Sequence, residues 1–145
     1  MSSLAGRTAL VTGGGSGLGA AISRRLHAEG VRVVVAGRRS DPLQRLADEL
    51  GNGIRAEVCH VADPDSVADL AHRLSGEQIS ILINNAGIAG PTGGTPEKPV
   101  GTVCLCIASS GASEERTVRL PGSRRDVRDR TTTVALHMLR ALLMR

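Results

Sequence analysis

A glycine-rich turn near the N-terminus holds the residues whose types and spacing most clearly indicate chemistry. The octapeptide Thr12–Gly19 reads TGGGSGLG and follows the apolar residues Ala9–Val11. Glycines let a backbone turn tightly and approach a ligand closely, and the free N–H groups at a helix N-terminus attract anions. We therefore expect this turn to bind a pyrophosphate group.

Two basic side chains follow the next apolar stretch and bear on the same ligand. Gly37 stands twenty residues beyond Gly17 and precedes Arg38 and Arg39. In a dinucleotide site, an acidic residue at the position of Gly37 would accept hydrogen bonds from the ribose 2′-hydroxyl. Glycine removes the carboxylate that would repel a 2′-phosphate, and two guanidinium groups can bind that phosphate. The alternative is an ordinary solvated basic turn.

The glycine turn needs a strand before it and a helix after it, and the sequence repeats this order. Leu18, Ile22 and Leu26 share one face of a helix predicted from Gly17 to Glu29. Two further helices follow the same pattern of cap, proline, spaced apolar residues and terminal glycine. The first is capped by Ser40 or Asp41 and ends at Gly51, and the second is capped by Asp63 and ends at Gly76.

Short apolar runs rich in β-branched residues separate the helices, at Val33–Ala36, Ile54–Val58 and Ile79–Ile83. Such runs, alternating with amphipathic helices, are typical of a parallel sheet covered on both faces. The fold class is therefore α/β, a Rossmann-like doubly wound parallel sheet of about four to five strands. We assign this unit to residues 1–90.

Four segments in a fixed order resemble the short-chain dehydrogenase/reductase family. They are the glycine turn, Gly37–Arg39, His60–Asp63 at the end of the third strand, and Asn84–Gly87 after the fourth. The resemblance covers about residues 4–90 and implies hydride transfer between an alcohol or carbonyl and NAD(P). Gly37, Arg38 and Arg39 favour NADP(H), with NAD as the weaker alternative. The cofactor-binding residues that it implies are Gly13, Gly15, Ser16, Gly17, Leu18, Gly19, Arg38, Arg39, Val61, Asn85, Ala86 and Gly87.

One position departs from this family's pattern, since His60 stands where the family usually has an aspartate near the adenine. A neutral imidazole could accept the adenine amino group, or His60 could be an inert residue at a strand end. We interpret Asp63 as a helix cap.

The catalytic half of the family's pattern is absent. The family uses a tyrosine as general acid/base, a lysine four residues later and a serine about thirteen residues before the tyrosine. The sequence has no tyrosine, and its one lysine, Lys98, follows Gly87 closely. Ser110 resembles the family's serine, or belongs to an incidental turn, and the positions that then correspond to tyrosine and lysine are Ser123 and Val127. We expect an inactive chain of unknown substrate.

Residues 91–145 do not continue the pattern, and we expect an irregular basic tail. Glycine and proline fill much of 89–101, and 116–130 contains six arginines. Within this part we predict only a strand at Val103–Ala108 and an amphipathic helix at Val134–Met144. A frame-shift relative to a longer reductase and a genuine short variant both explain the change.

The missing half also exposes part of the expected sheet. Val11 and Ile81–Ile83 would lack the helices that cover them in the family. We therefore expect either that the helix at Val134–Met144 folds back onto the sheet, or that the protein self-associates.

The charge and the cysteine content raise two further kinds of function, nucleic-acid binding and metal binding. The net charge of +4 lies entirely beyond residue 87, so a nucleic-acid-binding tail is an alternative function. No aromatic residue is present to stack on bases. The pair Cys104 and Cys106 has no partner at metal-ligand spacing, so we expect no metal site. No signal peptide or membrane span is apparent, and we expect a cytoplasmic protein.

Overall fold

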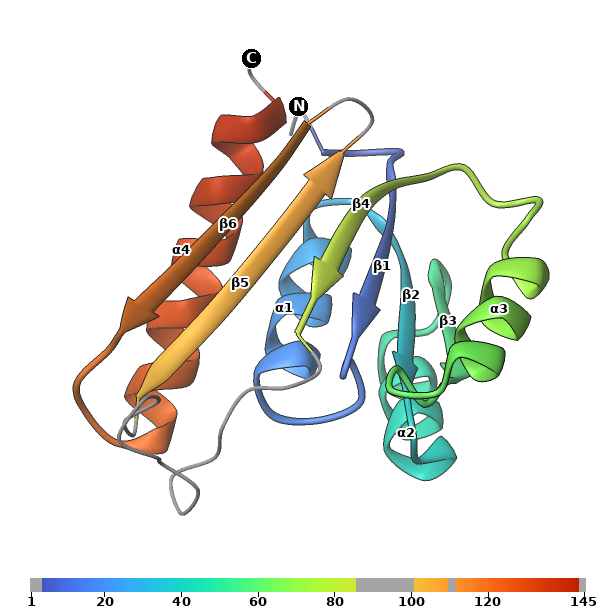
Figure 1. Ribbon diagram of the computed structural model, residues 1–145, viewed down its shortest axis with the longest axis horizontal. Helices are drawn as coiled ribbons and strands as arrows, with labels where there is room; N and C mark the ends of the chain where they lie inside the picture. Colours follow the sequence, from blue (N-terminus) through green and yellow to red (C-terminus); the bar gives the residue numbers. More distant parts are fainter. Residues whose placement is uncertain (1–3, 86–100, 110–111, 144–145) are drawn as a thin grey trace.

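The computed structural model describes residues 4–85, 101–109 and 112–143 (Figure 1). Strands and helices alternate through the first of these ranges, as β1 (Thr8–Thr12), α1 (Gly17–Ala28), β2 (Arg32–Gly37), α2 (Ser40–Leu50), β3 (Ile54–Val58), α3 (Pro64–Arg73) and β4 (Ile79–Asn84). The remaining elements are the hairpin strands β5 (Thr102–Ser109) and β6 (Ala112–Arg119) and the long helix α4 (Arg124–Leu143).

All six strands belong to one sheet with the order β3-β2-β1-β4-β5-β6. β1 lies at the centre and pairs in parallel with β2 and with β4, and β2 pairs in parallel with β3. β5 then pairs antiparallel with β4, and β6 pairs antiparallel with β5. The four-stranded parallel sheet with flanking helices confirms the predicted fold class, and the antiparallel hairpin extends it.

Helices cover the two faces of the sheet unequally (Figure 1). One face packs against α1, α2 and α4 in a single core, whose fully buried side chains include Ile22, Leu43 and Met138. On the other face, α3 covers β2 through a smaller cluster containing Val34 and Leu70. On this second face the described residues provide no helix over β5 and β6, and Ile79 at the start of β4 packs against the cluster of α3.

The three helices predicted before residue 80 are confirmed in place, with one correction at a boundary. Asp63 caps α3, because its side chain accepts a hydrogen bond of 3.1 Å from the backbone N–H of Asp65. The cap predicted at Ser40 or Asp41 is wrong, since α2 already begins at Ser40 and Arg39 occupies the N-cap position. The side chain of Arg39 makes no cap, because a guanidinium group has only N–H donors and cannot accept from the N–H groups of the helix.

The structure differs from the expected irregular tail between residues 112 and 133. β6 forms because the hairpin needs an apolar side chain on one face only, which Val118 supplies next to the core. α4 begins ten residues before the predicted helix, at a capping box in which Ser123 and Asp126 exchange hydrogen bonds. Arginines are compatible with both elements because they lie on solvent-facing positions such as Arg119 and Arg130.

The predicted exposure of Val11 and Ile81–Ile83 is also corrected. Val11, Ile81 and Ile83 are at most 1% exposed, in the core shared by α1 and α4. α4 does fold onto the sheet, but it joins the face of α1 and not the second face. On that second face Leu82 is half-buried.

Candidate functional site

The glycine turn joins β1 to α1 and leaves backbone N–H groups without helical partners. Gly13 and Gly17 have φ angles of 64° and 54°, a left-handed conformation that glycine adopts without strain. The first hydrogen bond at the start of α1 runs from the N–H of Ala20 to the carbonyl of Ser16. The preceding N–H groups of the first turn therefore point to the space before the helix. No acidic side chain lies in this turn to compete for them.

Gly19 lies against the backbone of its own turn. A Cβ atom at this position would overlap the carbonyl of Gly13 and would lie 2.6 Å from Nδ2 of Asn85. Gly19 is therefore fixed as glycine by close packing between α1, the turn and the end of β4. This contact holds the helix N-terminus at the carboxyl edge of the sheet.

A hydrogen-bond relay centred on Thr12 connects the ends of β1 and β4. The hydroxyl of Thr12 donates to Oδ1 of Asn84 over 2.8 Å and accepts from the backbone N–H of Asn85 over 3.0 Å. The side chain of Asn85 in turn donates to the carbonyl of Gly13 over 3.2 Å. The relay couples the position of the glycine turn to the end of the neighbouring strand.

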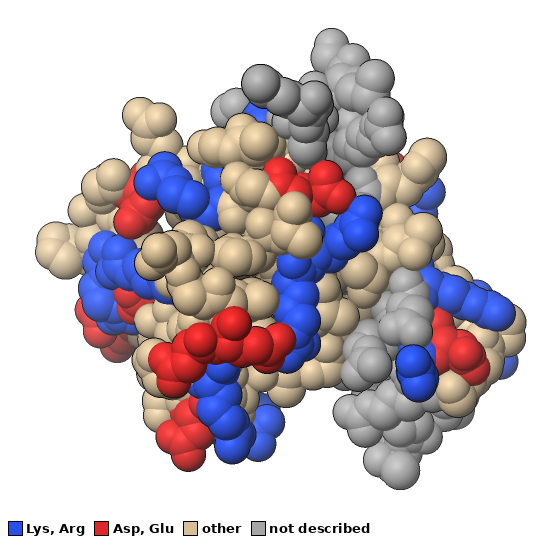
Figure 2. Space-filling model, turned by 180° about the vertical axis from the view of Figure 1, so that it is seen from behind, with Lys and Arg blue, Asp and Glu red and all other residues tan. Residues whose placement is uncertain are grey.

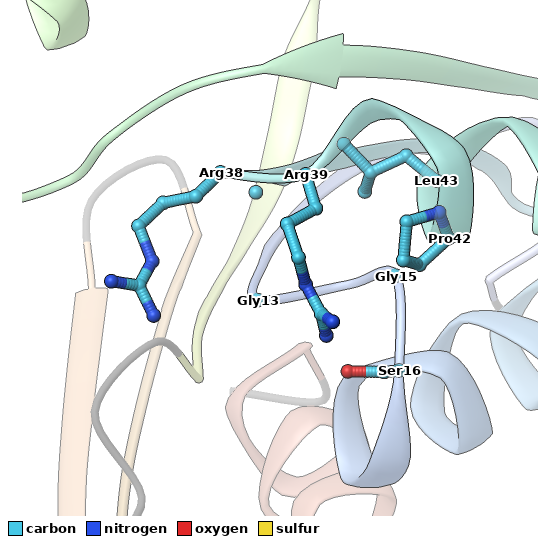
Figure 3. A pocket seen from close by; sticks show the side chains of 8 residues that line it. Gly13, Gly15, Ser16, Arg38, Arg39, Pro42 and Leu43 are labelled. Carbon is cyan, nitrogen blue, oxygen red and sulfur yellow. The ribbon is translucent and has the colours of Figure 1, made fainter.

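A pocket of about 130 Å³ lies beside the turn, between β1 and the start of α2. Its lining residues are Gly13, Gly15, Ser16, Gly37, Arg38, Arg39, Pro42 and Leu43. In Figure 3 the guanidinium group of Arg39 extends across the pocket towards Ser16, whereas Arg38 extends away from Pro42 and Leu43. The hydroxyl of Ser16 makes no helix-cap hydrogen bond, so it is available on the same side.

The pocket is basic and small. Its lining includes two arginines and no carboxylate. Its volume is well below the roughly 300–1,000 Å³ of pockets that enclose a drug-sized ligand. It is therefore suited to one anionic group of a larger ligand that continues along the surface.

The donor set fits a dinucleotide. Free N–H groups of α1 and the guanidinium groups suit phosphate oxygens, and the absence of a Cβ at Gly19 permits the tight turn. The buried Oδ1 of Asn85 has no hydrogen-bond partner among the described residues, and it lies on the amide that holds the turn. Such an acceptor fits a site completed by a hydroxyl-bearing ligand.

The structure brings most of the predicted cofactor residues together at this edge. Gly13, Gly15, Ser16, Gly17, Leu18, Gly19, Arg38, Arg39 and Asn85 lie in or beside the turn. Val61 is an exposed side chain between β3 and α3 and does not line the pocket. His60 is also exposed, and its backbone N–H donates to the hydroxyl of Ser66. Ala86, Gly87, Lys98 and Ser110 lie outside the described residues.

Sequence reasoning missed three residues of the site. Thr12 was considered only as the first residue of the glycine turn. A hydroxyl at the end of a strand was a signal for a hydrogen bond to the neighbouring strand. Pro42 and Leu43 were interpreted as residues of a helix start and a buried face. Both line the pocket because α2 begins directly after Arg39.

Ser123 and Val127, the positions that counting from Ser110 assigned to the family's tyrosine and lysine, have structural roles. The hydroxyl of Ser123 lies 2.7 Å from a carboxylate oxygen of Asp126 in the cap of α4. Val127 packs partly buried against the core. Neither position supplies an acid/base group.

Cys106 is a half-buried thiol beside Glu115 in the neighbouring strand. Burial raises the pKa of the Cys106 thiol, and the charge and hydrogen bonding of Glu115 raise it further. A thiol of raised pKa is a weak nucleophile. In the described ranges, no group of three or more His, Cys, Asp or Glu side chains could hold a metal ion. No helix of the described chain is long and apolar enough to cross a bilayer.

The arginine-rich segment is spread over two elements and partly neutralised. Arg116 forms an ion pair of 2.9 Å with Glu114, and Arg130 donates to the carbonyl of Pro121. Figure 2 shows basic and acidic side chains interspersed over the face that carries α1 and α4. This distribution lacks the single-sign surface that favours a nucleic-acid backbone.

A comparison with protein families finds one match that covers most of the chain. The family model described as short chain dehydrogenase matches residues 7–103. The match includes the glycine turn, the arginines after β2, the end of β4 and the start of β5.

Solved structures and curated proteins give a similar result over part of their length. A short chain dehydrogenase/reductase family protein has a TM-score of 0.56 and 43% identity, covering 69% of this chain and 41% of that one. Menthone neomenthol reductase from Mentha piperita has a TM-score of 0.51 and 34% identity, covering 57% of this chain and 32% of that one. A CinA-like protein of Mycobacterium tuberculosis is 51% identical over 84 residues, 57% of this chain. The chain spans 20% of that curated relative.

Proposed function

Because this chain belongs to the short-chain dehydrogenase/reductase family, we propose that it binds NADP(H) at the glycine turn and does not catalyse hydride transfer by itself. The observation that carries the proposal is the pocket in which Arg39 reaches across the turn towards Ser16. A bound nicotinamide dinucleotide would supply a hydride donor or acceptor at its nicotinamide ring.

Different residues of the site bind different groups of the dinucleotide. The N–H groups at the start of α1 and the side chain of Ser16 bind the pyrophosphate. Arg39 binds the 2′-phosphate at the end of β2, where Gly37 presents no carboxylate to repel it. Arg38 also lines the pocket and would add positive charge beside that phosphate. Asn85 and Thr12 hold the turn in place.

The absence of catalysis is inferred from the residue types. The family's acid/base tyrosine has no counterpart, because the sequence contains no tyrosine. Ser123, which falls at the tyrosine position if Ser110 is the family's serine, caps a helix. A serine hydroxyl is too weak an acid to replace a tyrosine whose pKa a lysine lowers.

A fluorescence titration with NADPH and NADH tests cofactor choice. We expect tighter binding of NADPH. Arg39→Asp should weaken NADPH binding by about tenfold to a few hundredfold, because a charge-assisted contact becomes a repulsion. Arg38→Asp should weaken it less and Arg45→Asp, an exposed change on α2, should leave it unchanged. Equal affinities of the unmodified protein for NADPH and NADH would contradict the proposal.

Turnover is measured separately as carbonyl-dependent oxidation of NADPH over a panel of aldehydes and ketones. We expect none above background, because a general acid alone contributes about 10²–10⁴-fold. Activity that persists through repeated purification and that is lost in Arg39→Asp would show that another side chain has taken over the proton transfer.

A further inference from the structure

α3 is attached to the sheet separately from the other helices (Figure 1). α1, α2 and α4 all contribute side chains to one core on the first face of the sheet. α3 contributes Leu70, and Leu74 at its C-cap, to the smaller cluster on the second face. Among the described residues, no other helix takes part in that cluster. The packing of α3 can therefore be lost without disturbing the core that the other three helices share.

α3 buries only half of its apolar stripe. Helical spacing places Val67, Leu70, Ala71 and Leu74 on one side of the helix. Leu70 and Leu74 are 5% and 6% exposed, whereas Val67 is 42% exposed and Ala71 is exposed as well. Two leucines thus supply most of the apolar contact between α3 and the sheet. An element held by few buried apolar side chains opens at a lower free energy than the whole fold.

The hydrogen bonds near α3 show where a movable segment would begin. The backbone N–H of His60 donates to the hydroxyl of Ser66, a bond that stays intact if residues 60–78 move as a body. The backbone N–H of Cys59, in contrast, donates to the carbonyl of Gly37 over 2.9 Å and holds Cys59 on β2. The boundary between the sheet and the movable segment therefore falls between Cys59 and His60.

Arg73, at the end of α3, ties the helix to β3. Its Nε donates to Oε2 of Glu57 over 2.8 Å, and a terminal nitrogen donates to the carbonyl of Val58 over 2.9 Å. Arg55 binds the other carboxylate oxygen of Glu57 over 2.7 Å and also lies 3.3 Å from Glu77. Glu57 is buried, so its charge requires such partners. Because Arg55 belongs to β3, Glu57 keeps one arginine partner even when Arg73 moves away.

We infer that residues 60–78 form a hinged flap, in which α3 opens from the sheet as a unit while the other helices stay packed. Arg73 and Glu57 are the latch of this flap. Opening withdraws the two buried leucines of α3 and breaks both hydrogen bonds of Arg73. The bonds within the flap and the ion pair between Arg55 and Glu57 remain.

A buried thiol beneath α3 reports this opening. Cys59 is 1% exposed, and its Sγ donates to the carbonyl of Ser66, in the first turn of α3, over 3.7 Å. Cys59 remains on the sheet when the flap opens, so its thiol becomes accessible to a reagent in solution. The rate at which Cys59 reacts therefore measures the population of the open state.

Alkylation of the full chain with iodoacetamide at constant pH, over a range of urea concentrations, tests the inference. Mass spectrometry of peptides separates Cys59 from Cys104 and Cys106. We expect the rate at Cys59 to depend little on urea below the unfolding transition, because opening the flap exposes little surface. A rate that rises steeply with urea, in parallel with global unfolding, would overturn the inference.

A core variant distinguishes the two routes to the thiol. Ile22→Val in α1 weakens the core of the first face and should raise the equilibrium constant for unfolding by about twofold to tenfold. The flap does not contact Ile22, so we expect the rate at Cys59 without urea to stay that of the unmodified protein. A rate that rises by the same factor as the unfolding constant would contradict a separate opening of α3.

Arg73→Gln tests the latch. The variant loses two charge-assisted hydrogen bonds, and we expect alkylation of Cys59 to become about tenfold faster. Arg24→Gln is the matched control, because it removes an arginine that pairs with Glu49 over 2.7 Å between α1 and α2. The control should leave the rate at Cys59 unchanged. Equal rates in Arg73→Gln and the unmodified protein would show that Arg73 does not hold the flap closed.

Discussion

The parallel unit of residues 4–85 and the hairpin with its helix, residues 101–143, share a sheet but are built in different ways. Every strand of the parallel unit returns to the sheet through a helix, so helices lie on both of its faces. The later part pairs directly with β4 and covers one face through α4. The parallel unit carries the proposed nucleotide site, whereas the later part mainly buries apolar surface. The comparison separates the residues that serve binding from those that serve stability.

The largest expected effect concerns α4. Met138→Ala should destabilise the protein by about 2–5 kcal/mol, because Met138 is 1% exposed in the core shared with α1. His137→Ala, an exposed neighbour, is the control and should change the free energy of unfolding by less than about 0.5 kcal/mol. Urea unfolding followed by circular dichroism measures both. Two separate transitions would show that the two parts do not unfold together.

Gly19→Ala tests the parallel unit at the binding site. The added Cβ would press on Nδ2 of Asn85 and on the carbonyl of Gly13, so we expect a loss of about 1–3 kcal/mol in stability and no detectable NADPH binding. Gly76→Ala adds the same methyl group where nothing lies within 4 Å. Normal binding in Gly19→Ala would mean that the turn tolerates displacement of α1.

Glu57 tests the charge network of the parallel unit. Burial alone would raise the pKa of Glu57, but hydrogen bonds from Arg73 and Arg55 outweigh it and lower the pKa. Glu57→Gln should cost about 1–2 kcal/mol at neutral pH, since both arginines are partly exposed to solvent.

The pH dependence of that loss has a definite sign. A lowered folded-state pKa stabilises the protein above the unfolded value of about 4.3, and the contribution disappears as the pH falls below it. The stability difference between the unmodified protein and Glu57→Gln should therefore close below about pH 4. Glu49→Gln, which removes the exposed ion pair with Arg24, is the control and should change stability little at any pH. A constant difference across the pH range would exclude the charge as its cause.

The smallest effect is expected at the start of α4. Ser123→Ala removes the hydroxyl that bonds to Asp126 and should cost about 1 kcal/mol in thermal unfolding. Ser113→Ala in β6 is the matched control, for which we expect no change. If Ser123→Ala left the stability unchanged, α4 would not begin at this cap. The helix would then start later in the chain, as the sequence alone had indicated.

The helices and strands of the parallel unit could be predicted from the sequence because short segments of the chain specify each of them. Each helix has its own spaced apolar residues, and caps such as Asp63 lie within two residues of their partners. The glycine turn and its arginines were likewise identified from a short segment. The contact between Gly19 and Asn85 was not predicted, because it joins residues 66 positions apart through the packing of β4.

The later part was predicted only where apolar residues are dense. Val103–Ala108 and Val134–Met144 fall within β5 and near the end of α4, but β6 and the first half of α4 have few apolar residues. Their order depends on pairing across the hairpin and on the cap of Ser123 and Asp126. The face on which α4 packs depends on the antiparallel direction of β5, which no local pattern encodes.

The position of β4 between β1 and β5 has a consequence for the order of events during synthesis. β1 cannot complete its second ladder until β4 has left the ribosome, and β5 has no strand to join before that. Domains fold from the N-terminus as they emerge, and long-range pairings are slow to form. We therefore expect a nascent chain to assemble β1, α1 and β2 first, before Asn85 at the end of β4 can hold the glycine turn. The hairpin and α4 can pack only after β4 has emerged, so the apolar surface of α1 and β4 that they bury stays exposed to solvent until then.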